Sequence, residues 1–149
     1  MNIVQLITPK NDLVYMYENY SVRQAIERLK QHKYSNVPIL SVDGVYLANI
    51  SEGDFLYFIT EHNYSMSDLE NINIMEIVKN DPKGAITVRA TFEELYLRIL
   101  NSNYVPVTDD RGYFMGIIKR RDLIKRLGTE YIKHRSGANF VSKNSGVRM

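Results

Sequence analysis

The chain contains two copies of one sequence pattern. In each copy a Val-Pro pair heads an apolar run, a glycine turn follows, and an aspartate closes the pattern. These marks are Pro38, Gly44 and Asp54 in the first copy and Pro106, Gly112 and Asp122 in the second. The offset is 68 positions at all three marks (106 − 38, 112 − 44 and 122 − 54). Because like modules bury against each other the surface that one alone would expose, the repeat predicts a paired architecture with two related sites.

Composition limits the kind of protein this chain can be. Its 149 residues suit one compact domain or two small ones. There is no cysteine, which excludes disulfides, thiolate zinc sites and cysteine nucleophiles from this sequence. The net charge of +2 is too small to indicate a nucleic-acid partner. Residues 1–5 lack a signal-peptide pattern and no apolar stretch approaches the ~20 residues of a membrane span. We therefore expect a cytoplasmic protein without membrane association.

Hydrophobic periodicity predicts the same order of elements in both copies. In the first copy we expect strands over 13–17, 37–42 and 45–50, with helices over about 22–33 and 52–61. In the second we expect strands over 86–88, 105–107 and 113–118, with helices over 92–100 and 120–127. Gly128 is expected to stop the last helix. Capping boxes are predicted at Ser21–Gln24 and Thr91–Glu94, where a hydroxyl and a side chain three residues on satisfy each other's backbone donors.

The spacing also predicts a difference between the copies and a division into domains. Val22 to Pro38 spans 16 positions, whereas Phe92 to Pro106 spans 14, so the first helix of the second copy should be about half a turn shorter. We expect a first domain over 1–62, a polar linker over 63–71, a second domain over 72–130, and a helix end with a flexible tail over 131–149. Short lead segments, 3–8 and 72–78, would precede the two domains.

Each copy thus reads β-α-β-β-α, with a proline heading one strand and an aspartate just inside the last helix. The pattern is carried by residues 35–39 with 48–54 and by residues 103–107 with 116–122. It resembles the CBS domain, named for cystathionine β-synthase, over roughly residues 3 to 128, and the chain looks like a stand-alone bacterial CBS pair. The resemblance implies an α+β fold of tandem CBS domains, in which two small sheets pack as a pseudo-twofold Bateman module. It also implies a homodimer.

The resemblance further implies a regulatory ligand and its contacts. CBS pairs often bind AMP, ADP, ATP, S-adenosylmethionine or cyclic dinucleotides such as cyclic di-AMP between the copies, and no other cofactor is required. The aspartate typically holds the ribose, and residues before the opposite proline line the adenine pocket. Carried onto this sequence, one cleft would combine Asp122 with Tyr34, Ser35 and Asn36, and with Lys10 and Tyr15 near the base. The other would combine Asp54 and Ser51 with Asn103 and Tyr104, and with Ala85 and Asn80 in the lead-segment places.

The chemistry of these residue types agrees with such roles. A carboxylate can accept hydrogen bonds from the two adjacent hydroxyls of a ribose. Backbone donors at a helix N-terminus favour a nearby phosphate. The second copy adds positive charge at Lys119, Arg120 and Arg121, where the first copy has serine, glutamate and glycine. We therefore expect the Asp122 cleft to be the better phosphate site.

Structural alternatives exist for the same residues. Ser51 and Asp54 also fit a capping box. Pro38 and Pro106 fit an architectural role, because each ends a helical segment and starts a strand. The basic run also fits a solvated helix face. Lys119 replaces the hydroxyl residue that is usual in the family at this position.

No catalytic constellation is visible in the sequence. The three histidines lack metal-ligand spacing, and the phosphate-loop, Gly-x-Ser-x-Gly and His-Glu-x-x-His motifs are all missing. We predict a non-catalytic adenine-nucleotide-binding regulatory module that acts on an unidentified protein partner. The alternative is a structural dimerisation or protein-interaction module whose nucleotide sites have decayed. Nucleic-acid binding through the basic last helix is disfavoured by the near-neutral charge.

Overall fold

Two lobes, one from each copy of the repeat, make up the protein. The computed structural model describes residues 2–32, 35–78 and 84–138. The first repeat has the elements β2 (Met16–Tyr17), α1 (Val22–His32), β3 (Asn36–Leu40), β4 (Tyr46–Ser51) and α2 (Glu52–His62). The second has β5 (Ile86–Thr87), α3 (Phe92–Ile99), β6 (Tyr104–Thr108), β7 (Phe114–Lys119) and α4 (Arg120–Ala138). The predicted order β-α-β-β-α is therefore present twice.

The first helix of each repeat begins where its capping residues predict. The amide of Ser21 donates to Gln24 Oε1 at 2.8 Å, and the amide of Gln24 donates to Ser21 Oγ at 3.1 Å. Thr91 and Glu94 form the same reciprocal pair at the start of α3. Both predicted capping boxes are confirmed. With 8 residues against 11 in α1, α3 is also the shorter helix, as the spacing predicted.

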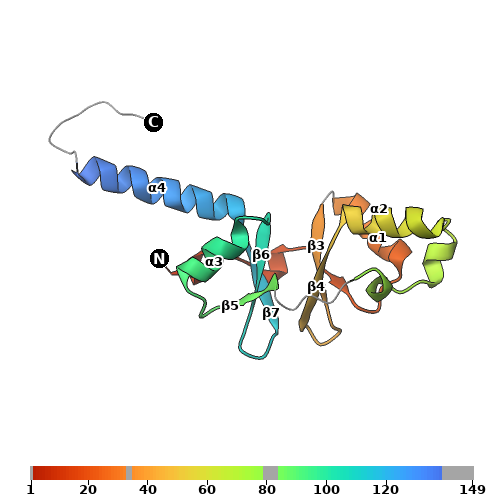
Figure 1. Cartoon of the computed structure of the whole chain (residues 1–149). Coiled ribbons are helices and arrows are strands. Elements are labelled where there is room, and N and C mark those ends of the chain that lie inside the picture. Colours follow the sequence, from red (N-terminus) through yellow and green to blue (C-terminus); the bar gives the residue numbers. More distant parts are fainter. Residues whose placement is uncertain (1, 33–34, 79–83, 139–149) are drawn as a thin grey trace.

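The two sheets share one strand register, which confirms the tandem α+β fold. β3 runs antiparallel to β4 with Pro38 opposite Asn49, and β6 runs antiparallel to β7 with Pro106 opposite Ile117. The lead strands β2 and β5 pair in parallel with β3 and β6. Figure 1 shows the sheets side by side at the centre, with α1 and α2 outside one sheet and α3 outside the other. The helices therefore cover the outer faces, and the inner faces meet.

The segment that precedes each repeat packs into the other repeat. The 3₁₀ helix η1 (Ile3–Leu6) buries Ile3 and Leu6 in the core of the second repeat, and β1 (Ile7–Pro9) pairs antiparallel with β7. In return, η3 (Asp68–Asn71) and η4 (Ile74–Glu76) bury Leu69 and Ile74 in the core of the first repeat. From sequence order, residues 3–8 were expected to belong to the first repeat and residues 72–78 to the second. In the structure each segment instead packs into the core of the other repeat. The predicted linker 63–71 thus contains a core residue.

A third apolar cluster joins the two lobes. Leu40, Phe114 and Ile117 are buried in it, and a ring of partly buried residues surrounds them, namely Leu13, Tyr15, Tyr17, Tyr46 and Tyr104. At the hairpin turns the amide of Tyr46 donates to Gly112 O at 3.0 Å, and the amide of Phe114 donates to Gly44 O at 2.9 Å. These two bonds are related by the 68-residue offset. The lobes therefore meet about a pseudo-twofold axis.

The last helix is longer than its sequence pattern indicates. The prediction that Gly128 ends it is wrong, because α4 continues to Ala138 and projects beyond the second lobe (Figure 1). A glycine inside a helix costs about 1 kcal/mol, and it ends a helix when it adopts the left-handed conformation of a C-cap. Gly128 is not among the residues with positive φ. The part of the predicted tail from residue 139 onward lies outside the described residues.

Candidate functional site

A cleft of about 430 Å³ opens between the two repeats. Residues from the lead segment and from both proline-headed hairpins line it: Leu13, Val14, Ser35, Asn36, Pro38, Asn103, Tyr104, Ile117, Lys119, Arg120 and Arg121. The strands position these side chains, since β3 begins at Asn36 and β7 ends at Lys119. One part of the lining is apolar and another is cationic. The cleft can therefore receive a molecule that has both an apolar and an anionic end.

The cationic wall comes from the junction of β7 and α4. The amide of Arg120 donates to Asn103 O at 2.9 Å, and its guanidinium Nη2 donates to Asn103 Oδ1 at 2.9 Å. Lys119 and Arg121 are exposed, and neither forms an ion pair with a carboxylate of the described residues. Among the described residues, no carboxylate lines the cleft. An anion at Lys119 and Arg121 would gain charge-assisted hydrogen bonds without breaking an ion pair within the described residues.

A polar group from each repeat meets the other repeat at the floor of the seam. The Tyr104 hydroxyl on β6 donates to Asn49 Oδ1 on β4 at 2.6 Å. Burial, and then the neighbouring Tyr46 phenol, raise the pKa of Tyr104 far above its ordinary value. Tyr104 therefore stays neutral and able to donate at physiological pH.

Asn36 Oδ1 is buried and accepts no hydrogen bond from the described residues. A buried acceptor without a donor costs about 1–3 kcal/mol. Asn36 lines the cleft. If the Asn36 amide turned toward a bound ligand and its Oδ1 accepted a hydrogen bond from that ligand, part of this cost would be recovered.

The structure brings together six residues that the sequence assigned to two separate clefts. Ser35 and Asn36 precede the first proline, Asn103 and Tyr104 precede the second, and Lys119 and Arg121 flank the start of α4. They all line the same cleft between the repeats. The reason is the pseudo-twofold axis, which places the two pre-proline segments next to each other.

Other predicted residues lie elsewhere. Ser51 and Asp54 form a capping box, in which the amide of Ser51 donates to Asp54 Oδ2 at 2.8 Å and the amide of Asp54 to Ser51 Oγ at 3.2 Å. Lys10 Nζ lies 5.3 Å from the centroid of the Tyr15 ring, and Tyr15 packs in the seam between the lobes. Neither of these pairs lines the cleft.

The remaining predicted residues are also outside the lining. Asp122 is the third residue of α4, is half-buried, and is not among the residues that line the cleft. The carbonyl of Ala85 accepts a hydrogen bond from Arg98 Nη1 at 3.5 Å. Tyr34 and Asn80 lie outside the described residues.

Sequence reasoning missed the apolar part of the lining. Leu13, Val14 and Ile117 were expected only as strand residues of the core. An apolar side chain that faces a cleft has the same sequence pattern as one that faces the core. Only the packing of one lobe against the other distinguishes them.

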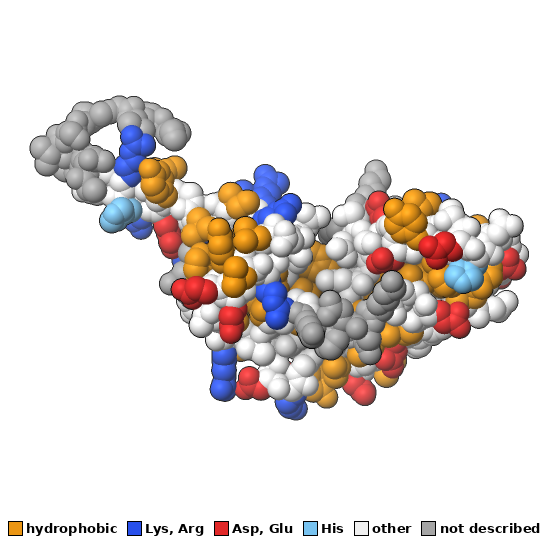
Figure 2. All heavy atoms as spheres, viewed as in Figure 1, with side chains coloured by type: hydrophobic (Ala, Val, Ile, Leu, Met, Phe, Trp, Pro, Cys, Tyr) orange, Lys and Arg blue, Asp and Glu red, His pale blue; other side chains and the backbone are white. Residues whose placement is uncertain are grey.

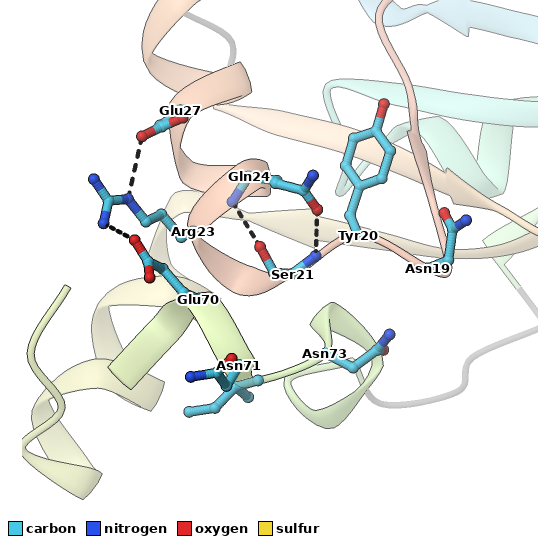
Figure 3. A pocket seen from close by; sticks show the side chains of 10 residues that line it. Asn19, Tyr20, Ser21, Arg23, Gln24, Glu27, Glu70, Asn71 and Asn73 are labelled. Atoms are coloured by element: carbon cyan, nitrogen blue, oxygen red, sulfur yellow. Dashed lines mark hydrogen bonds and ion pairs between the residues drawn. The ribbon is translucent and has the colours of Figure 1, made fainter. Parts of the chain in front are cut away.

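A second hollow, of about 550 Å³, lies between the start of α1 and residues 70–73 (Figure 3). Its charged side chains pair with each other: Arg23 Nε lies 3.3 Å from Glu27 Oε1, and Arg23 Nη1 contacts Glu70 Oε1. Ser21 and Gln24 are engaged in the capping box. Because these groups already satisfy one another, the inter-repeat cleft is the stronger candidate site.

Within residues 2–32, 35–78 and 84–138, no cluster of three or more His, Asp or Glu side chains is arranged to hold a metal ion. No helix in the described part of the chain is long and apolar enough to cross a membrane.

Comparison with known proteins identifies the repeat. Residues 4–61 and residues 74–129 each match the CBS domain. The chain belongs to the CBS domain family. The resemblance seen in the sequence is therefore confirmed, and the two lobes are two CBS domains.

Relatives and solved structures agree with this assignment. An uncharacterised protein of Methanocaldococcus jannaschii is 25% identical over 143 residues, covering 76% of this chain and 85% of that protein. The crystal structure of CbpB in complex with c-di-AMP is similar with a TM-score of 0.83 and 19% identity, covering 92% of this chain and 91% of that chain. CBSX2 in complex with AMP gives a TM-score of 0.71 and 19% identity, covering 87% and 98%. At this level of identity the two structures establish the fold.

Proposed function

We propose that this CBS pair is a non-catalytic regulatory module that binds an adenine nucleotide in the cleft between its domains. The observation that carries the proposal is the lining of the cleft, in which the described residues combine three cations with an apolar surface and include no carboxylate. Phosphates suit the cationic part, and an adenine ring suits the apolar part. CbpB and CBSX2, which share the fold, are described in complex with c-di-AMP and AMP. This similarity supports the proposal.

The geometry suggests how such a ligand would lie. Its phosphate would contact Lys119 and Arg121, and its base would pack near Val14 and Ile117. Asn36 would offer the base a polar contact. The ribose role of Asp122 remains a proposal, since this carboxylate stands one position beyond Arg121 on α4. To meet a bound sugar, the Asp122 side chain would have to reach the cleft, which it does not line in this structure.

A regulatory module needs a surface that transmits the bound state. Figure 2 shows apolar side chains gathered over α3 and continuing along α4. Six of them are exposed: Tyr96, Leu97, Leu100, Ile124, Tyr131 and Ile132. Exposed apolar clusters of this kind are typical of protein–protein contacts. We propose a cytoplasmic homodimer that contacts a protein partner, in which nucleotide shifts the balance between two arrangements by binding one of them more tightly.

Thermal unfolding with nucleotides tests the proposal directly. Purified protein is heated with AMP, ADP, ATP, S-adenosylmethionine or cyclic di-AMP at millimolar concentration. A ligand that binds only the folded chain stabilises it by about 2.7 kcal/mol at a concentration 100 times its Kd, so the midpoint should rise clearly for at least one. Asp122→Asn should weaken that response if the carboxylate holds the ribose. The absence of any shift with all five compounds would contradict the proposal.

A second candidate is a dimerisation module that no longer binds nucleotide. Two observations favour it: the Asp54 carboxylate is engaged in a helix cap, and Asp122 does not line the cleft. This candidate predicts a stable dimer whose thermal midpoint is unchanged by every nucleotide tested. The same experiment therefore separates the two functions.

A further inference from the structure

The pseudo-twofold axis allows the two halves of the module to be compared residue by residue. The backbone is equivalent on both sides: the amide of Arg120 donates to Asn103 O at 2.9 Å, and the amide of Glu52 donates to Ser35 O at 3.0 Å. Both pairs are related by the 68-residue offset. Differences in side chains at equivalent positions therefore report differences in what each half can bind.

The two halves differ in charge at three successive positions. Lys119, Arg120 and Arg121 in the second repeat correspond to Ser51, Glu52 and Gly53 in the first. At these positions the second repeat has three cations, whereas the first repeat has one carboxylate and no cation. Ser51 Oγ is already engaged in capping α2, and Glu52 lines a different hollow, between α1 and α2. An anion would be attracted to the cations of the second repeat, and the equivalent positions of the first repeat offer it no positive charge.

The two halves also differ in the side chains that meet between the sheets. Asn36 and Ile117 line the open cleft, and their counterparts at the 68-residue offset are Tyr104 and Asn49. In that counterpart position the tyrosine ring reaches across the seam, and its hydroxyl bonds to Asn49 at 2.6 Å. Tyr104 and Asn49 are therefore joined by a hydrogen bond across the seam, whereas the equivalent pair, Asn36 and Ile117, cannot be joined in this way because isoleucine has no polar side-chain atom.

We infer that the module has a single anion-binding site per chain, formed by Lys119 and Arg121, with no equivalent site at residues 51–53. The inference deepens the proposed function and rests on it for the nucleotide. The anion site itself can be tested without a base or a sugar. It would make each chain respond to one ligand, although its fold is doubled.

Isothermal titration with two probes tests the inference. Inorganic tripolyphosphate reports the anion site alone, and AMP reports anion and base together. We expect one site per chain for each. The double variant Lys119→Ala, Arg121→Ala should weaken both by about tenfold or more, because charge-assisted contacts are lost. Both side chains are exposed, so the variant should fold. The matched control, Lys133→Ala on the distal part of α4, should leave both affinities within about twofold.

Each result decides the inference. Two sites per chain for tripolyphosphate, binding unaffected by the double variant, or no tripolyphosphate binding at low salt would overturn it. If tripolyphosphate binds at one site that needs Lys119 and Arg121, but none of the five nucleotides binds, the single anion site stands and the proposed function fails. If AMP fills two sites per chain, the proposed function stands and the single site fails.

Discussion

At the scale of single residues, the bond from Tyr104 to Asn49 is the most informative contact. It joins a strand of one domain to a strand of the other, so it reports the packing between the domains rather than within either. Its donor is held in the neutral form by burial. Both residues would be unremarkable in a sequence, because tyrosine and asparagine are common in strands and at their ends.

Tyr104→Phe is predicted to destabilise the fold at neutral pH. It removes the donor and leaves Asn49 Oδ1 without this partner, so the free energy of unfolding should fall by about 1–3 kcal/mol. Urea denaturation near pH 8 measures the change. Tyr96→Phe is the control, because Tyr96 is 44% exposed and its hydroxyl can bond to water. Equal stabilities of the two variants would contradict the prediction.

The same variant carries a pH dependence of known sign. The pKa of Tyr104 is raised in the folded chain, so the folded state holds its proton more tightly than the unfolded state. The contribution of Tyr104 is complete below the ordinary tyrosine pKa of about 10 and decreases as pH rises above it, because the unfolded chain then ionises first. The difference in stability between the wild type and Tyr104→Phe should therefore shrink above about pH 10. A difference that grows there would refute the assigned cause.

At the scale of elements, β1 explains a difference between the two repeats. Gly116 on β7 corresponds to Ala48 on β4 by the 68-residue offset. Gly116 lies opposite Pro9 of β1, which adds a fourth strand to the second sheet, whereas β4 is an edge strand of the first sheet. A Cβ at Gly116 would stand 2.8 Å from Ile7 Cγ2 and would collide with the carbonyl of Thr8. The glycine is therefore required by the crossing segment.

Gly116→Ala should displace β1 and cost about 1–3 kcal/mol of stability, as overpacking does. Hydrogen exchange of the β1 amides, together with chemical denaturation, measures both effects. Gly128→Ala is the matched control, since no atom lies within 4 Å of a Cβ there. In the middle of α4 it should instead stabilise the helix by roughly 0.5–1 kcal/mol. If hydrogen exchange of the β1 amides is unchanged in Gly116→Ala, the close contact between Gly116 and β1 is not the reason for the glycine.

At the scale of the whole molecule, the two domains are interlocked by their exchanged lead segments. Residues 3–9 complete the second domain, and residues 69–76 complete the first. Neither domain keeps its full core without a segment that belongs, in sequence, to the other. The pair should therefore unfold as one cooperative unit rather than as two. This coupling also gives a ligand in the seam a route to influence both lobes.

The exposed helices predict the oligomeric state. Leu97 on α3 and Ile124 on α4 are 67% and 61% exposed. Burying such side chains against a second copy would remove apolar surface from water. We expect the wild type to sediment as a dimer and the double variant Leu97→Glu, Ile124→Glu to sediment as a monomer in analytical ultracentrifugation. Val42→Glu, at a residue that is 57% exposed near the hairpin turn, is the control and should remain dimeric. A monomeric wild type would refute this arrangement.

The sequence was sufficient for features that depend on short spacings. The capping pairs, the turn at Gly44 and the order of helices and strands follow from contacts between residues a few positions apart. The 68-residue offset further predicted that both domains would share one fold, and the identical strand register confirms it. Gly128 shows the limit of local reasoning, because a glycine ends a helix only if the chain also turns there.

Only the tertiary structure decided which segments meet. Ile3 and Ile74 look alike in sequence, each an apolar residue ahead of a repeat, yet each completes the core of the other domain. The cleft that brings Asn36 and Lys119 together depends on how the two sheets pack about their pseudo-twofold axis. Periodicity fixes which face of an element is apolar but carries no information about its distant partner. The sequence by itself therefore determined a doubled α+β fold, and long-range packing determined where that fold has room for a ligand.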